Sequence, residues 1–117
     1  MFVYAMEDVT HPITKIGVSK NPEARAKQVG AVVVKARYEV ADRFIANLIE
    51  SMAHAFAIRK YGRSSVRTGD GRTEFFKCTV RQAMGFILRA YQLFSKMGYD
   101  ALRSYRRNFC RRNKIRL

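Results

Sequence analysis

Three side chains near the N-terminus carry groups that can act on a phosphate ester: the phenol of Tyr4, the ammonium of Lys15 and the guanidinium of Arg25. A phenol or an amine can orient or deprotonate a water molecule, and a guanidinium can hold phosphate oxygens. Lys15 precedes Ile16 and Gly17 at the expected end of a strand, and Arg25 falls in the first turn of the next expected helix. Each residue alone also fits an ordinary structural role, so the combination carries the prediction of a phosphate site.

A second group of side chains lies further along the chain. Asn47, Glu50 and His54 follow one another at spacings of three and four residues, which places them on one helix face, with Arg43 a turn earlier. A carboxylate beside an imidazole can bind a divalent cation or exchange protons. The spacing differs from the zinc-protease pattern His-Glu-x-x-His. We expect this face to lie roughly opposite the centre of the apolar stripe, and a solvated face with an ordinary ion pair is the alternative.

Periodicity and residue type predict the elements that must position these side chains. The expected strands span residues 2–7, 14–19, 31–40 and 74–78. The expected helices span residues 22–29, 42–61 and 79–96, and a basic tail follows. Helix starts are marked by Asn21 before Pro22, by Asp42, and by Thr79 with Gln82 in a capping-box pattern. This order predicts an α+β fold with a small, largely antiparallel sheet, in which residues 74–78 form a short fourth strand.

Composition and charge bound the function. A chain of 117 residues with 48% hydrophobic content is most simply one folded domain. The formal net charge of +14 is costly to hold in one compact body unless a polyanion neutralises it. Nucleic acid is therefore the expected partner. A generally basic surface, as in ribosomal or phage structural proteins, is the alternative.

The positive charge is concentrated at the C-terminus. Residues 101–117 contain seven Lys or Arg and no acid, and Tyr105 and Phe109 interleave with the arginines. Arginine binds phosphate through its planar fork and also stacks on bases, so the segment fits a nucleic-acid-binding arm. A solvated helix end or a disordered basic tail fits the same composition. The candidate nucleic-acid-binding residues of the chain are Lys20, Lys27, Arg103, Arg106, Arg107, Arg111, Arg112 and Lys114.

The two cysteines give little chemistry. Cys78 and Cys110 are far apart and have no zinc-ligand spacing, so we expect free thiols in a reducing compartment. The N-terminus lacks the features of a signal peptide, and no apolar run is long enough to span a membrane. We therefore expect an intracellular, cytoplasmic protein with no membrane partner.

Ordered motifs across residues 2–76 resemble the GIY-YIG nuclease superfamily, in its phage and bacterial branch whose second tripeptide is Lys-Ile-Gly. The first tripeptide is FVY at residues 2–4, and the second is KIG at residues 15–17. The stretch SKNPEAR then resembles the family's turn and the helix start that carries its arginine. The stretches LIESMAHAF and GRTEFF resemble the branch's Glu-x-x-x-His helix and its late Glu-aromatic-Phe element.

The resemblance implies a small fold with a central antiparallel three-stranded sheet flanked by helices, and DNA cleavage with one divalent metal, Mg²⁺ or Mn²⁺. By resemblance, Tyr4 is the general base or orients the water, and Lys15 polarises that water or tunes Tyr4. Arg25 holds the scissile phosphate, Glu50 binds the metal, and His54 orients or supplements the metal site. Glu74, in the late Glu-aromatic-Phe element, is a further candidate for the active site, and a purely structural role is the alternative.

Two readings of the whole chain follow. The first is a metal-dependent DNA endonuclease or nickase that a phage or mobile element encodes. We expect it either to have weak sequence selectivity or to be targeted by a protein partner. The second is a non-catalytic protein that retains the nuclease fold and binds nucleic acid or a host protein. Residues 1–78 form the expected nuclease-like core. Residues 79–117 are expected to be either part of the same domain or a nucleic-acid-binding extension.

Overall fold

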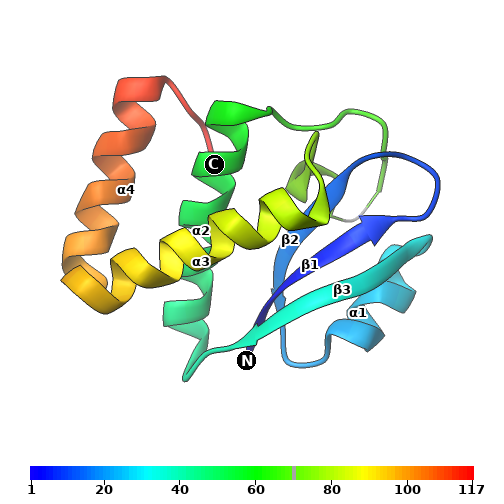
Figure 1. Cartoon of the computed structure of the whole chain (residues 1–117), viewed down its shortest axis with the longest axis horizontal. Helices are drawn as coiled ribbons and strands as arrows, with labels where there is room; N and C mark the ends of the chain where they lie inside the picture. The colour runs from blue at the N-terminus through cyan, green and yellow to red at the C-terminus, as the bar shows by residue number, and fades with distance from the viewer. Residues whose placement is uncertain (70) are drawn as a thin grey trace.

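Strands dominate the first third of the chain and long helices the rest in the computed structural model, which describes residues 1–69 and 71–117 (Figure 1). Asp70, in the loop that follows the expected helix at residues 42–61, lies outside the described residues. The strands are β1 (Phe2–Asp8), β2 (Thr14–Ser19), β3 (Val32–Glu39) and β4 (Phe75–Phe76). The helices are α1 (Pro22–Val29), α2 (Arg43–Lys60), α3 (Val80–Met97) and α4 (Tyr99–Asn113), with a 3-10 turn at Arg72–Glu74. In this described part, no helix combines the length and the apolar character needed to cross a bilayer.

The described strands form one antiparallel sheet in the order β3-β1-β2-β4. The register of β1 against β2 sets Tyr4 directly opposite Gly17, and Lys15 lies two residues before Gly17 on the same face. Val3 and Ile16 point to the other face and join the apolar core. The expected α+β fold with its small antiparallel sheet is confirmed. The fourth strand is shorter than residues 74–78, because Glu74 belongs to the 3-10 turn and β4 holds two residues.

Side-chain caps fix where α1, α2 and α3 begin, as the sequence predicts. Asn21 accepts a hydrogen bond from the Ala24 amide, and Asp42 accepts one from the Ile45 amide. Thr79 and Gln82 form a full capping box at the start of α3. These caps satisfy amides that have no partner inside the helix, so they set the helix starts independently of the packing that follows.

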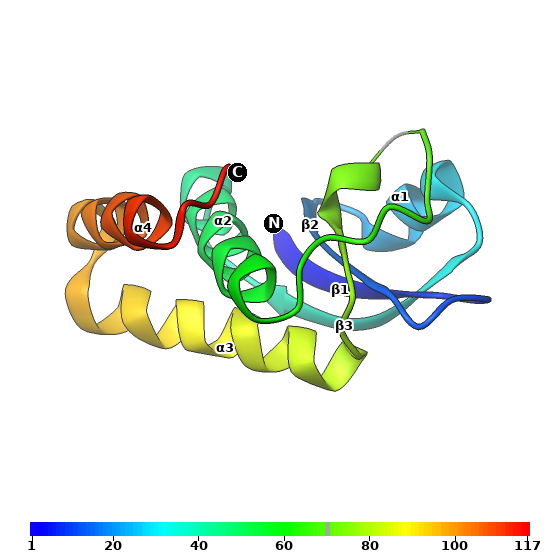
Figure 2. The same cartoon turned by 90° about the horizontal axis from the view of Figure 1, so that it is seen from above.

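Helices lie on both sides of the sheet (Figure 2). α3 runs along one face, α1 lies against the other, and α2 packs against α3, α4 and the adjacent end of the sheet. The core between them is made of fully buried side chains from several elements, among them Ile49 and Met52 of α2, Ile87 of α3 and Phe76 of β4. This packing orients α2, the helix that carries Glu50.

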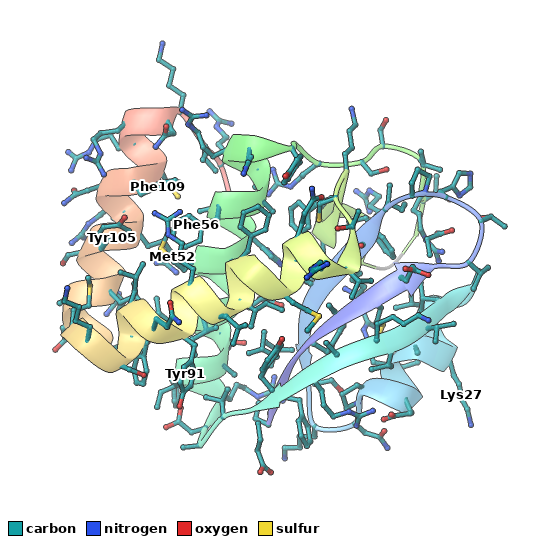
Figure 3. The ribbon with its side chains drawn as sticks, in the orientation of Figure 1. Lys27, Met52, Phe56, Tyr91, Tyr105 and Phe109 are labelled. Carbon is teal, nitrogen blue, oxygen red and sulfur yellow. The ribbon has the colours of Figure 1, made fainter. Side chains whose placement is uncertain are left out.

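The basic tail is a regular helix, α4, and not the disordered segment that its composition also allowed. Leu102 is 0% exposed, and the Phe109 ring packs edge-on against Phe56 of α2 at 5.3 Å between centroids (Figure 3). Tyr105 stacks on Phe109 in the same layer. These apolar residues recur at helical spacing but are outnumbered by arginines, so charge masked the amphipathic pattern. Gly98 ends α3 at a φ of 82° and starts α4 at once.

Shortening Leu102 tests whether α4 is part of the cooperative fold. We expect Leu102→Ala to lower the free energy of unfolding by about 2–5 kcal/mol, because it leaves a cavity at a fully buried position. Ser104→Ala, on the exposed side of the same helix, is the control and should change it by about 0.5 kcal/mol or less. Urea unfolding followed by circular dichroism measures both. Equal stability of the two variants would contradict the packing of α4 on the core.

Candidate active site

Tyr4 and Gly17 form the floor of the site on the face of the sheet that α1 covers. The Tyr4 side chain is 1% exposed and lies across Gly17, where an added β-carbon would stand 2.3 Å from the phenol oxygen. Only glycine therefore allows the ring to occupy this place. Burial raises the pKa of Tyr4 to about 12, although the nearby Arg25 guanidinium opposes the shift. The phenol is thus a hydrogen-bond donor at neutral pH.

Lys15 is buried beside this ring, although it is a strand lysine that the sequence would also allow to face solvent. Its side chain is 0% exposed, and Nζ lies 5.7 Å from the centroid of the Tyr4 ring and 5.9 Å from that of Phe75. Glu74, from the 3-10 turn, forms an ion pair with this ammonium. Burial, assisted by the positive charge of Arg25, lowers the pKa of Lys15 to about 8.

The loop before β4 closes over both cations of the site. Gly71 has a φ of 75°, and a β-carbon there would lie 3.0 Å from Lys15 Nζ and 3.6 Å from a terminal nitrogen of Arg25. Arg25 therefore reaches from α1 to the same point of the loop as Lys15. Its other terminal nitrogen donates to Gln28 one turn later, at 3.1 Å. The structure thus brings Tyr4, Lys15 and Arg25 together, as their combination in the sequence predicts.

Glu50 faces the same site from α2. Its side chain is half-buried, and burial raises its pKa to about 7, while the positive charge of Lys15 opposes that rise. A carboxyl group in this state is readily ionised by a nearby cation, so its chemistry fits a metal ligand. Among residues 1–69 and 71–117, no three His, Cys, Asp or Glu side chains gather to hold an ion. A one-carboxylate site suits Mg²⁺, which keeps several waters and takes oxygens from substrate phosphates.

His54 occupies a different place from the one its helical spacing suggests. The expectation that this helix face lies opposite the apolar stripe holds for Arg43, which is exposed, and is wrong for His54, because the C-terminal half of α2 is packed against the sheet and other helices. The His54 ring is buried and packs against the Phe76 ring, with 5.0 Å between the two ring centroids. Its Nε2 lies 2.8 Å from the carbonyl oxygen of Ile16. Burial lowers its pKa to about 4, so the ring is neutral and Nε2–H donates that hydrogen bond. Asn47, by contrast, is exposed.

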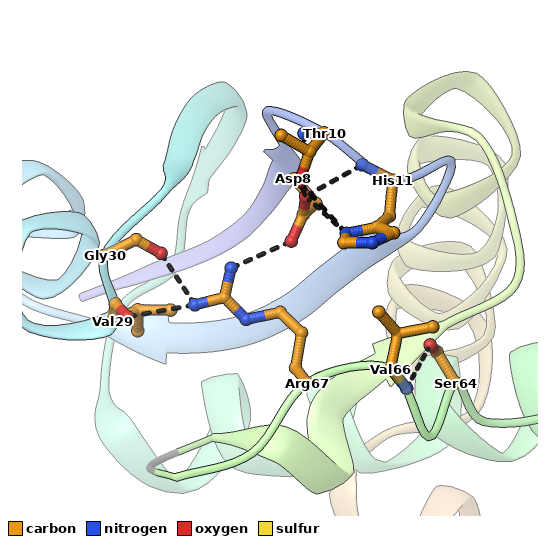
Figure 4. Close-up of polar contacts among 8 residues, drawn as sticks. All are labelled: Asp8, Thr10, His11, Val29, Gly30, Ser64, Val66 and Arg67. Carbon is orange, nitrogen blue, oxygen red and sulfur yellow. Dashed lines mark hydrogen bonds and ion pairs between the residues drawn. The ribbon is translucent and has the colours of Figure 1, made fainter.

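A buried ion pair that the sequence does not reveal holds the loop before β4 in place (Figure 4). Arg67 donates to the Asp8 carboxylate at 2.8 Å and to the carbonyl oxygens of Val29 and Gly30. Although burial alone would raise the pKa of Asp8, the bonds from Arg67 and from the backbone amides after β1 hold it well below its usual range. The Arg67 guanidinium also lies over the Phe75 ring, 4.8 Å from its centroid. One side chain therefore ties the loop to β1, α1 and β4.

The predicted nucleic-acid-binding residues fall on two parts of the surface. Lys20 follows β2, and Lys27 projects from α1 into solvent, as Figure 3 shows. The others lie on α4 or directly after it: Arg103, Arg106, Arg107, Arg111, Arg112 and Lys114. All of these are exposed except Arg106, which is half-buried because it donates to the Ser51 hydroxyl of α2 at 2.9 Å.

Comparison with known proteins places the N-terminal three quarters of the chain in one family model. The model of the T5orf172 domain matches residues 1–90. This domain is found in phage proteins and is associated with nuclease-type proteins similar to GIY-YIG and HNH enzymes, while the GIY-YIG family model itself does not match. No curated protein and no solved structure matches the chain. The coarser part of the resemblance, to phage proteins of a nuclease-associated type, is therefore supported.

Two glycines test the contact between Tyr4 and Gly17. Gly17→Ala should lower the free energy of unfolding by about 1–3 kcal/mol, because its β-carbon overlaps the Tyr4 phenol. Gly85→Ala, in the middle of α3 with open space around it, is the matched control and should raise stability by about 0.5–1 kcal/mol. Thermal and urea unfolding measure both. A Gly17→Ala protein as stable as wild type would mean that the ring does not lie on this glycine.

The buried state of His54 predicts a specific dependence of stability on pH. Its pKa of about 4 in the fold lies below the unfolded value of about 6.5, so its contribution is complete above pH 6.5 and is lost as the pH falls toward 4. We expect wild type to lose stability relative to His54→Gln in this window, by up to about 1.4 kcal/mol per pH unit. Glutamine keeps a donor for the Ile16 carbonyl. Parallel curves for the two proteins would contradict a neutral, buried ring.

Proposed function

The chain belongs to the T5orf172 domain family, and from that premise we propose that it cleaves DNA phosphodiester bonds as a metal-dependent endonuclease or nickase of a phage or mobile element. The observation that carries the proposal is the buried ammonium of Lys15 between the Tyr4 ring and the Glu74 carboxylate, with Arg25 close by. Burying an ionisable amine costs free energy, and such groups cluster at functional sites. The net charge of +14 supports a polyanionic substrate.

The residues divide the work of hydrolysis according to their charge states. Arg25 binds non-bridging oxygens of the scissile phosphate through its guanidinium. Tyr4, whose pKa is about 12, stays protonated and orients the attacking water by a hydrogen bond. Lys15, whose pKa is about 8, is partly neutral near that pH and is the better acceptor for the proton of the water. Glu74 then stabilises the ammonium that forms.

Glu50 is the residue proposed to hold Mg²⁺ or Mn²⁺, with the remaining ligands coming from water and the phosphate. When bound, the metal ion neutralises charge that develops on the phosphate and on the leaving oxygen. His54 acts as a positioning residue in this proposal, because its hydrogen bond to the Ile16 carbonyl fixes α2 against β2 and so fixes the distance between Glu50 and Lys15.

Removing the Glu50 carboxylate tests catalysis. We expect Glu50→Ala to reduce nicking of supercoiled plasmid in Mg²⁺ or Mn²⁺ by about a hundredfold or more, because the loss of a metal ligand removes several kcal/mol of transition-state stabilisation. Glu7→Ala, which removes an exposed carboxylate from β1, is the control for the change in net charge and should leave nicking unchanged. Equal nicking rates for wild type and Glu50→Ala would contradict the catalytic role of Glu50.

A protein that binds nucleic acid without cutting it is the second candidate. The observation that favours it is the row of exposed arginines on α4, outside the residues that the family model matches. In that case wild type binds DNA with a steep dependence on salt and nicks no plasmid with any divalent metal.

A further inference from the structure

A pocket beside the candidate active site has the chemistry of a nucleotide site. It lies where the N-terminal halves of α2 and α4 run side by side in the same direction (Figure 1). Its volume is about 330 Å³, and it is lined by Phe44, Asn47, Leu48, Tyr99, Arg103 and Arg106. Asn47 precedes Glu50 by three residues, so their β-carbons are about 5–6 Å apart on the helix surface. The pocket therefore begins one helical turn from the proposed metal ligand.

Phe44 is an apolar ring that the fold does not use. It is 73% exposed, the highest value among the large apolar side chains within residues 1–69 and 71–117. A second ring, Tyr99, lines the other wall and has the Arg103 guanidinium 5.8 Å from its centroid. Proteins commonly bind unpaired nucleotides with an exposed aromatic ring next to arginines, because every base has a face that can stack on such a ring.

The arginines of the pocket can reach a phosphate. Arg106 is held in place by its hydrogen bond to Ser51, and Arg103 lies one turn before it on α4. Both also line an adjoining depression with Arg107, where Asp100 is the one acid among the lining residues. The positive charge next to the exposed Phe44 ring favours a nucleic-acid strand over an apolar protein segment as the occupant.

We propose that this pocket binds one unpaired nucleotide of the DNA strand that enters the active site. Phe44 stacks on its base, and Arg103 and Arg106 bind the adjacent phosphate. The inference rests on the proposed function, since the bound nucleotide belongs to the DNA strand that the site is proposed to cut. It goes further by predicting a preference for DNA with an unpaired nucleotide near the cleavage point.

Binding experiments in EDTA separate this pocket from catalysis. Fluorescence anisotropy is measured with an oligothymidylate, the same backbone carrying abasic sites, and a fully paired duplex. We expect Phe44→Ala to weaken binding of the oligothymidylate about five- to a hundredfold, with little change for the abasic strand or the duplex. Arg103→Gln should weaken binding of both single strands and reduce the slope of log affinity against log salt by about 0.7.

Matched variants on α3 serve as controls. Tyr91→Ala removes an aromatic ring that is 44% exposed, and Arg81→Gln removes an exposed arginine; neither should reproduce the effects above. Phe44→Leu keeps the apolar character without the ring and should also weaken binding. The proposal is overturned if Phe44→Ala behaves like Tyr91→Ala, or if it weakens binding of strand, abasic strand and duplex equally.

The outcome for the pocket and the outcome for the enzyme are independent. If wild type never nicks plasmid but Phe44 controls binding of the single strand, the pocket stands and the nuclease proposal fails. If Glu50 proves essential for nicking while Phe44→Ala binds all three probes like wild type, the nuclease proposal stands and the pocket is rejected.

Discussion

The ammonium of Lys15 buried in the sheet is the constraint on which the rest of the site depends. A charge without water around it needs partners, and each partner here comes from a different element. The Tyr4 ring lies on β1, the Phe75 ring on β4 and the Glu74 carboxylate on the turn before it. The backbone of Gly71 closes over Nζ in a conformation that a larger residue would strain. The position of Lys15 thus determines the course of the chain from the end of α2 to β4.

The Asp8–Arg67 pair makes that course stable. A polar loop has few apolar contacts of its own, so its free energy of opening would be low without an anchor. Arg67 supplies one by bonding to Asp8 of β1 and to the two carbonyls that end α1. The lowered pKa of Asp8 keeps this carboxylate charged through the neutral and mildly acidic range. The clamp thereby holds Glu74 against Lys15.

Local signals predict the helices and strands well, because caps, turns and alternation act within a few residues. Asn21, Asp42 and Thr79 cap the helices that the sequence assigns to them. The proximity of Tyr4 to Lys15 is also predictable, since a hairpin brings them together once its register is fixed. The roles of His54 and Arg67 are not predictable in this way. Both depend on partners far along the chain, a strand carbonyl for one and a buried carboxylate for the other.

The packing of the C-terminal helix is not visible in its composition, and the cause of that packing bears on function. A helix of 15 residues is only marginally stable alone in water because its nucleation is costly, so α4 owes its order to the packing of Leu102 and Phe109 and to the surface of α2.

Fixing the arginines on a packed helix changes how they bind. A disordered basic arm loses conformational entropy when it docks on nucleic acid, and it adapts to any arrangement of phosphates. Arginines on α4 have already lost much of that freedom, and Arg106 is further held by Ser51. We therefore expect them to favour a strand whose phosphates match the spacing along α4. Since α4 is packed on the helix that bears Glu50, that strand is also held at a fixed distance from the candidate active site.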